Sequence, residues 1–377
     1  MSIKDPVSDM RYLAHESLRD GQLQMFVDAS SVLNKGGFLL ANAPTGIGKT
    51  AAALSAALTV ARSGMQRRNI LFMTGRQTQH RIVVDTVRKI NERLENQRQK
   101  VTLVDMIGQK DMCIHPIVSE IEIGFSRQCS ELRSKRKCEP FMEDSPELRK
   151  RVLQDPLHVD ELISISKNNV SEGVDCPTCP WKVARETAAD ADILVCDYNH
   201  LFNENVRNAS LKAMGLELSD MILILDEAHN LPERIRMGLR RRLNADLIRD
   251  AGFELEEHIG ENKGVHDIAR ARACETIIKR FRNRFIQWVK EQKPNLKGAQ
   301  GRRDEQEMRV DPEVVLSILR QELSGSISGG SVTFEGFMQQ LLEVNVNSNE
   351  DEENTACERL ATVLDILRRF EKSSAMC

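Results

Sequence analysis

Aromatic residues and long apolar runs are both scarce in this chain of 377 residues. Aromatics make up 4% of it, with two Trp and two Tyr, which argues against an extensive surface for stacking nucleic-acid bases. The longest apolar run, near 221–225, is far shorter than the roughly 20 residues that span a bilayer. The first ten residues lack the apolar core of a secretory signal. We therefore expect no membrane partner and a cytoplasmic location, associated with the nucleoid if the source is prokaryotic.

Net positive charge is lacking too, since the formal charge is -3. That value excludes a uniformly basic coat for nucleic acid but allows a local basic groove. With 41% hydrophobic and 29% charged residues the chain can bury a core, and at roughly 150 residues per domain its length predicts two to three domains. Nine cysteines, an odd number without a secretory signal, favour free thiols or metal ligands over a disulfide framework.

Strand-like and helical patterns alternate over the first 110 residues and resume near residue 192. Such alternation predicts an α/β fold with a parallel sheet. Residues 111–181 break the pattern and hold five of the nine cysteines, and after about residue 231 only helical periodicity remains. A cysteine-rich insert and a mainly helical second domain are therefore predicted. The strand candidates are the runs 38–43, 70–74, 101–104, 192–196 and 221–225, the first of them a buried strand that leads into a loop.

A phosphate-binding loop is predicted at residues 43–50, Ala-Pro-Thr-Gly-Ile-Gly-Lys-Thr, between a strand candidate and an Ala/Leu-rich helix. Its glycines let successive backbone N–H groups point at phosphate oxygens, and the helix N-terminus adds a positive dipole end. Lys49 supplies a point charge for the β- and γ-phosphates, and the Thr50 hydroxyl is placed for Mg²⁺. Ala43 stands where the strict pattern has Gly. The predicted ATP contacts are Thr45, Gly46, Gly48, Lys49 and Thr50.

A second motif, Asp-Glu-Ala-His at 226–229, ends the apolar run 221–225. Asp226, at the carboxyl end of a strand, can hold Mg²⁺, and Glu227 can orient or deprotonate an attacking water. His229 is a candidate for relaying the nucleotide state to a nucleic-acid track. Either motif alone could be an ordinary turn. Together they predict a Mg²⁺-dependent ATPase on a P-loop NTPase fold, with Lys49, Asp226 and Glu227 as its catalytic residues.

The two motifs together resemble superfamily 2 helicases, and the cysteine-rich segment narrows the resemblance. Residues 111–116, DMCIHP, resemble the start of the iron–sulfur segment of the XPD/DinG-like helicases. Residues 179–185, CPWKVAR, resemble the segment with the last cluster ligand, and residues 197–202, DYNHLF, resemble the stretch that follows it. The family's order of motifs is reproduced over roughly residues 15–235. The chain thus resembles the N-terminal half of an iron–sulfur DNA helicase of this family.

The resemblance implies a [4Fe–4S] cluster, a cofactor that proteins hold with four thiolates. The implied ligands are Cys113, Cys129, Cys138 and Cys179. Cys176 is a fifth nearby thiol that could replace Cys179, and a structural Zn²⁺ would suit four cysteines on chemical grounds. Three further cysteines fall in predicted strands or helices and are interpreted as core residues: Cys196, Cys274 and Cys357.

The resemblance also implies an adenine contact and a DNA path. Residues 19–22, Arg-Asp-Gly-Gln, resemble the family's adenine motif and select Gln22, although Gln24 is close by. Residues 74–79 resemble motif Ia, which grips the backbone of a single strand, so Thr74 and Arg76 are predicted phosphate contacts. Arg185 and the basic residues between 127 and 137 are predicted to line the path of single-stranded or forked DNA.

The resemblance implies a RecA-like motor lobe over 1–110 and 186–235, an iron–sulfur domain over 111–185 and an arch-like helical domain over 236–377. Since no second set of alternating strands and helices precedes residue 377, we expect the second motor lobe to be absent. The predicted function is an ATP-dependent 5′–3′ DNA helicase, with weak hydrolysis until another chain supplies that lobe and with repair or transcription factors as further partners. The alternative is a non-catalytic nucleic-acid-binding or regulatory module, or a split-helicase subunit, that uses ATP as a ligand switch.

Overall fold

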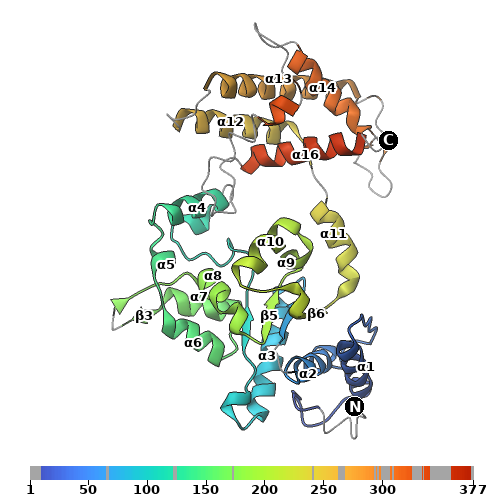
Figure 1. The fold of residues 1–377 in the computed structure, drawn as a ribbon, viewed down its shortest axis with the longest axis vertical. Helices are drawn as coiled ribbons and strands as arrows, with labels where there is room; N and C mark the ends of the chain where they lie inside the picture. Colours follow the sequence, from blue (N-terminus) through green and yellow to red (C-terminus); the bar gives the residue numbers. More distant parts are fainter. Residues whose placement is uncertain are drawn as a thin grey trace. The chain divides into compact units, whose positions relative to one another are not determined.

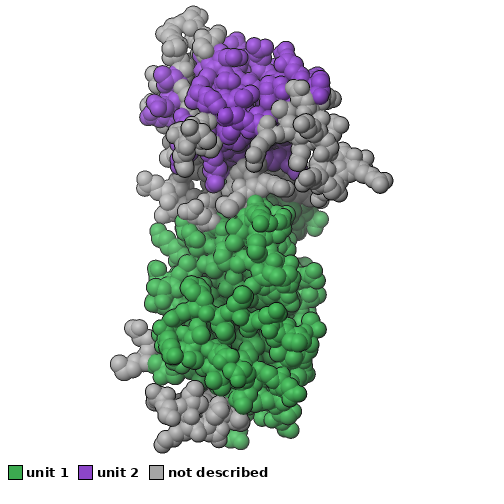
Figure 2. Space-filling view, turned by 90° about the vertical axis from the view of Figure 1, so that its right-hand side faces the viewer, with its two compact units in different colours: residues 1–239 green, residues 240–377 purple. Residues whose placement is uncertain are grey.

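The computed structural model divides the chain into two compact units, residues 1–239 and 240–377, which Figure 2 colours separately. Each unit has a hydrophobic core of its own. The residues that the structure describes are 10–64, 68–121, 125–171, 174–239, 242–261, 268–292, 294, 297–298, 306–307, 310–324, 333, 335–339 and 358–374.

A four-stranded parallel sheet forms the centre of the first unit, in the order β2-β5-β1-β6 (Figure 1). β1 pairs with a neighbour on each side, so that Leu71 lies opposite Leu194 in β5 and Leu223 in β6. The parallel α/β fold predicted from the sequence is confirmed. The strands are β1 (Asn69–Met73), β2 (Leu103–Asp105), β5 (Ile193–Cys196) and β6 (Met221–Leu225).

One face of the sheet is covered by α2 (Lys49–Ala61) and α3 (Gln77–Arg93). Because strand side chains alternate between faces, Ile70 and Phe72 of β1 pack on this side. They meet the apolar positions of the two helices, which include the fully buried Leu54 and Val87. α1 (Gln22–Lys35) packs against α2 and leads toward the phosphate loop.

The opposite face is covered largely by the cysteine-rich insert. Leu71 and Met73 of β1 share a core with Leu148, Leu162 and Val183 of the insert. Residues 111–185 as a domain of their own therefore stay a prediction, because this core joins them to the sheet. The helices and strands of the insert are α4 (Phe125–Ser134), α5 (Glu139–Met142), α6 (Pro146–Gln154), α7 (Val159–Lys167), β3 (Val170–Ser171), β4 (Val174–Asp175) and α8 (Pro180–Thr187). Three further helices of the first unit follow it: α9 (Asn199–Phe202), α10 (Glu204–Ala213) and α11 (Leu231–Leu239).

The second unit is built mainly of helices around a core that contains Phe281, Leu316 and Leu364. Cys274 lies in this core with 1% of its surface exposed, as predicted, whereas Cys357 falls outside the described residues. In the part of the chain that the structure describes, no helix is both long and apolar enough to span a membrane. The elements are α12 (Ala245–Glu261), α13 (Ile268–Gln292), β7 (Lys297–Gly298), β8 (Gln306–Glu307), α14 (Pro312–Ser324) and α16 (Glu358–Ser374), with a helical segment at 335–339.

The prediction that the apolar run 38–43 forms a buried strand is wrong. This segment has no regular secondary structure, and Phe38 and Leu40 are 104% and 88% exposed. An apolar run becomes a buried strand only where neighbours pair its backbone and cover its faces. Among the described strands, β6 ends the sheet and has no hydrogen-bonded partner on its outer side. The apolar pattern alone does not reveal whether such a pairing edge is occupied.

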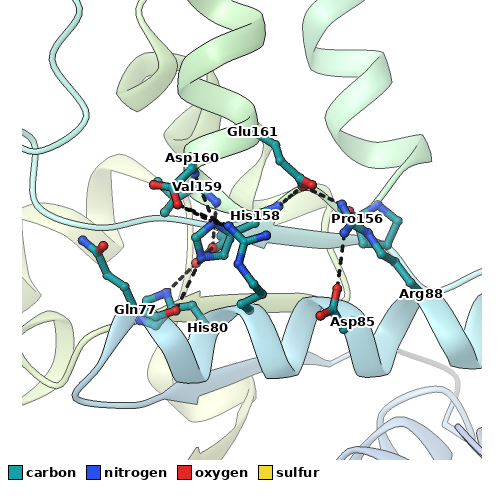
Figure 3. A network of polar contacts seen from close by, with 11 residues as sticks. Gln77, His80, Asp85, Arg88, Pro156, His158, Val159, Asp160 and Glu161 are labelled. Carbon is teal, nitrogen blue, oxygen red and sulfur yellow. Dashed lines mark hydrogen bonds and ion pairs between the residues drawn. The ribbon is translucent and has the colours of Figure 1, made fainter.

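A buried polar cluster joins the sheet to the insert (Figure 3). His80 of α3 lies with its Nδ1 atom 2.6 Å from Oδ1 of Asp105, which ends β2. The backbone N–H of Val159, the first residue of α7, donates to Oδ2 of Asp105 at 2.9 Å. His158 caps α7, and its Nε2 donates to the carbonyl oxygen of Gln77 at 3.4 Å. A single carboxylate thus connects α3, β2 and α7.

Replacing Asp105 with Asn should lower the free energy of unfolding by about 3 kcal/mol, the cost of breaking a buried charge-assisted pair. The amide can keep one of the two acceptors, but it then turns an N–H₂ group toward a donor. Asp85→Asn is the matched control, because Asp85 lies on α3, the helix of His80, has 51% of its side chain exposed and pairs with Arg88 at the surface. Urea unfolding followed by circular dichroism measures both variants. An equal loss in the two variants would contradict the role assigned to Asp105.

Candidate active site

The phosphate loop lies between the irregular segment after α1 and the start of α2 at Lys49. Gly46 and Gly48 have φ values of 89° and 84°, a left-handed conformation that side chains with a Cβ rarely adopt. A methyl group on Gly48 would also lie 2.1 Å from Nε2 of Gln22. The backbone conformation therefore requires glycine at position 48, and a Cβ atom there would also displace the amide of Gln22.

Three side chains donate hydrogen bonds to carbonyl oxygens of this loop. Nζ of Lys49 donates to the carbonyl oxygens of Ala43 at 3.0 Å and Pro44 at 3.2 Å. Gln22 donates from Nε2 to the carbonyl oxygen of Gly48 at 3.2 Å, and Arg19 donates to that of Gly46. Carbonyl oxygens repel phosphate oxygens. Because these donors pair with the carbonyl oxygens, the loop can present its backbone N–H groups to a phosphate instead.

Gln22 lies against the loop rather than on an open surface, with 5% of its area exposed. Its Oε1 accepts the backbone N–H of Arg19 at 2.9 Å, so both ends of the amide are engaged. An adenine contact by Gln22 stays a prediction. It requires the amide to give up its hydrogen bonds to Arg19 and Gly48 and to bond to the base instead. Gln24 instead bonds to Asp28 on the surface of α1.

The two acidic residues of the second motif follow β6 directly. The backbone N–H of Asp226 donates to the carbonyl oxygen of Met73 at 2.9 Å, which continues the pairing of β6 with β1. Burial raises the pKa of Asp226, the negative charge of Glu227 raises it further, and the positive charge of Lys49 lowers it. Lys49 and Asp226, 177 positions apart in the sequence, therefore converge within electrostatic reach. A hydroxyl and a carboxylate are the oxygen ligands that Mg²⁺ prefers, so Thr50 and Asp226 fit this ion by donor type.

Glu227 has a backbone conformation unusual for a residue with a side chain, with φ 51° and ψ 43°. Its carbonyl oxygen accepts the backbone N–H of Asn230 at 3.0 Å. Its carboxylate lies 3.1 Å from Nδ1 of His229, whose side chain is 71% exposed. The histidine predicted to relay the nucleotide state thus contacts the carboxylate predicted to act on water.

Four of the cysteines of the insert lie near one another. Burial raises the pKa of the Cys179 thiol to about 12, and charge on Cys138, Cys129 and Cys113 adds to this rise. Burial likewise raises the pKa of Cys129 to about 11, with a contribution from Cys113 and Cys138. Cys138 and Cys179 precede the first helical residues of α5 and α8, which a bond from the Cys179 N–H to the carbonyl oxygen of Pro140 at 2.7 Å holds together.

Cys176 differs from these four. Its thiol donates to Oε2 of Glu143 at 3.4 Å, and none of the other cysteines perturbs its pKa. Within the described residues, no three His, Cys, Asp or Glu side chains are arranged closely enough to hold a metal ion. The four thiols fit a thiolate-bound cluster by donor type, and they influence one another electrostatically, but binding would have to draw them together and replace their protons.

The residues predicted to contact DNA differ in how far the structure exposes them. Thr74 is fully buried and its hydroxyl donates to Gln79, so the structure does not present this side chain at the surface. Arg76 is exposed at the N-terminal end of α3. Arg185 stacks its guanidinium over the ring of Trp181, 4.2 Å from the ring centroid, and Arg133 lies 5.8 Å from the same centroid. Two cations therefore gather around one of the two tryptophans.

Comparison with known proteins shows what this part of the chain is similar to. Residues 73–246, from the last residue of β1 to the second residue of α12, match the DEAD_2 family model. This segment, a little under half of the chain, is similar to the corresponding region of XPD-like superfamily 2 helicases. It contains the second motif and all four candidate cluster ligands, whereas the phosphate loop precedes it.

Two of the following three relatives of this region are named as helicases. The ATP-dependent DNA helicase CHL1 of Eremothecium gossypii is 27% identical over 44% of this chain and 20% of its own length. The Fanconi anemia group J protein homolog of Gallus gallus is 28% identical over 43% of this chain and 13% of its own. A regulator of telomere elongation helicase 1 homolog from Aedes aegypti is 31% identical over 33% of this chain and 12% of its own.

The chain thus matches a fifth or less of the length of these relatives. A solved structure of an XPD helicase superposes on 95% of this chain and 52% of its own, with a TM-score of 0.49 and 16% identity.

The sequence motifs do not single out three of the residues that shape the site. Tyr198 bonds to the backbone of Asp226, and Arg19 bonds to the phosphate loop. Asp105 links the helix after the Thr74–Arg76 turn to the insert. Arg19 and Tyr198 do carry a sequence signal, because they lie in the stretches 19–22 and 197–202, whereas Asp105 lies in neither stretch.

Proposed function

We propose that this chain is the ATP- and Mg²⁺-binding motor segment of an XPD-type DNA helicase that moves 5′ to 3′ along single-stranded or forked DNA. The observation that carries the proposal is the convergence of Lys49 and Asp226 at one end of a parallel sheet. This is the edge where α/β sheets bind their ligands. The DEAD_2 relatives named as ATP-dependent DNA helicases support the same conclusion.

The chain's residues divide the work as follows. The phosphate loop binds the nucleotide when Lys49 leaves the carbonyls of Ala43 and Pro44 for the β- and γ-phosphates. Thr50 and Asp226 would hold Mg²⁺, and the ion would supply positive charge beside the phosphates. Glu227 orients the attacking water and accepts its proton, and His229 responds to that change through its contact with the carboxylate. The presence of all these groups favours an enzyme over a purely regulatory module.

The insert is proposed to hold a [4Fe–4S] cluster through Cys113, Cys129, Cys138 and Cys179, with Cys176 outside the ligand set. The mutual influence of the four thiols supports this assignment. Arg76 and Arg185 are proposed to bind DNA phosphates, with the basic residues of the insert beside them. A second motor lobe on another chain, repair or transcription factors and a cytoplasmic location remain predictions.

Binding of a fluorescent oligo-dT strand, followed by anisotropy, tests the DNA part of the proposal. We expect Arg76→Ala and Arg185→Ala each to weaken binding about fivefold, since one charge-assisted contact to phosphate contributes about 1 kcal/mol near a solvated surface. The slope of log Kd against log salt should fall by about one phosphate contact. Arg249→Ala on α12 is the control, because that residue pairs with Asp246 and Asp250 in the second unit. Unchanged affinity in both test variants would contradict the assignment, and absent oligo-dT binding by the wild type would contradict the proposed function.

A further inference from the structure

Tyr198 lies where the ends of β5, β1 and β6 meet. It comes two residues after β5, and its side chain is buried with 3% of the residue exposed. Its hydroxyl donates to the carbonyl oxygen of Asp226 and lies 3.3 Å from that of Glu227. The phenol therefore binds the backbone of the turn that carries both acidic side chains.

That turn needs a restraint. Glu227 has left-handed backbone angles, which cost a residue with a Cβ atom about 1 kcal/mol and persist only where the surroundings impose them. The backbone angles of a residue set the direction of its Cα–Cβ bond, from which the carboxylate extends. A hydroxyl bound to the carbonyls of Asp226 and Glu227 therefore restrains the backbone from which these two carboxylates extend.

The other side of the Tyr198 ring faces the turn after β1. A Cβ atom on Gly75 would lie 3.3 Å from Cε2 of Tyr198 and 3.9 Å from Nη2 of Arg234. Gly75 stands between Thr74 and Arg76, in the turn proposed to meet the DNA backbone. Because packed interiors transmit displacements, a shift of this turn reaches the ring and, through its hydroxyl, the Asp226 carbonyl.

We propose that Tyr198 is a positioning residue that couples DNA contact at residues 74–76 to the Asp226–Glu227 carboxylates. This inference rests on the proposed function. Coupling between two binding sites is reciprocal, so DNA and Mg²⁺-nucleotide change each other's affinity by the same factor. In this proposal Tyr198 transmits the change in affinity between the two sites without contacting either ligand.

The first test is a binding cycle with oligo-dT and Mg²⁺·AMP-PNP, a non-hydrolysable ATP analogue. The wild type should bind oligo-dT with an affinity that Mg²⁺·AMP-PNP changes about tenfold, within the usual range of such coupling. In Tyr198→Phe, which loses only the hydroxyl, the ratio should fall to about twofold while oligo-dT alone binds nearly as before. Tyr12→Phe is the matched control, because Tyr12 is the other tyrosine, is also buried and bonds to Arg62 instead.

The second test needs no change at Tyr198. Labelling with 3-fluorotyrosine gives two ¹⁹F resonances, and Tyr12→Phe leaves that of Tyr198 alone. Oligo-dT and Mg²⁺·AMP-PNP, added separately, should each shift the Tyr198 resonance. Ligand binding without a shift, or an unchanged coupling ratio in Tyr198→Phe, would overturn the inference while the proposed function stands. A wild type that binds neither ligand would overturn both.

Discussion

Lys49→Ala is expected to weaken ATP binding about 100-fold, because loss of a charged hydrogen-bond donor to phosphate removes close to 3 kcal/mol of binding free energy. The folded state should change little. The ammonium group of Lys49 bonds only to the carbonyl oxygens of Ala43 and Pro44 in the structure, and the exposed Pro44 carbonyl can bond to water instead. Nucleotide binding and stability should therefore separate in this variant.

Titration calorimetry with Mg²⁺·ATP measures the affinity, and a thermal melt checks the fold. Lys35→Ala provides the control, since Lys35 is an exposed residue in the last turn of α1 in the same unit. We expect the control to bind ATP as the wild type does. If Lys49→Ala kept an affinity close to that of the wild type, residues 43–50 would not be the phosphate site.

Cys179→Ser is expected to abolish the iron–sulfur cluster, whereas Cys176→Ser should retain it. The two cysteines are three positions apart, so the pair tests ligation rather than general disturbance of the segment. Cys179 lies within reach of Cys113, Cys129 and Cys138, whereas Cys176 faces Glu143 on the surface. A serine hydroxyl is a poor substitute for a thiolate toward iron.

Iron and sulfide content and visible absorbance after anaerobic purification provide the readout. The wild type and Cys176→Ser should be brown and contain about four iron atoms per chain, as a cubane cluster requires. Cys179→Ser should be colourless. A colourless wild type that contains zinc would contradict the iron–sulfur cluster. Loss of iron in Cys176→Ser but not in Cys179→Ser would make Cys176 the fourth ligand in place of Cys179.

The sequence was most informative about elements whose pattern is local. The runs around Leu71 and Leu194 are apolar because both faces of these central strands are covered, and the Ala/Leu content of α2 marks a helix by propensity. The run at 38–43 has the same local pattern and is no strand. Whether a strand forms there depends on a pairing edge elsewhere in the fold, which no local pattern contains.

The site divides in the same way. Lys49 and Asp226 could be assigned to one site from the sequence because their two motifs act together in a Mg²⁺-dependent ATPase, although the strand expected at 38–43 does not form. The burial of Thr74 could not be predicted from the sequence, because it depends on which way one side chain turns at the end of β1. Asp105 and Tyr198 were missed because their partners lie on other elements, up to 54 positions away for Asp105. Long-range polar contacts of this kind leave no periodic signal.

Binding of ATP to the wild-type chain with and without Mg²⁺ tests most directly whether the phosphate loop and the Asp226–Glu227 turn form one site. If Thr50 and Asp226 hold the ion beside the nucleotide, Mg²⁺ should strengthen ATP binding about tenfold or more, as a ligand-bridging cation does. Equal affinity in Mg²⁺ and in EDTA, or no ATP binding in either, would contradict the account.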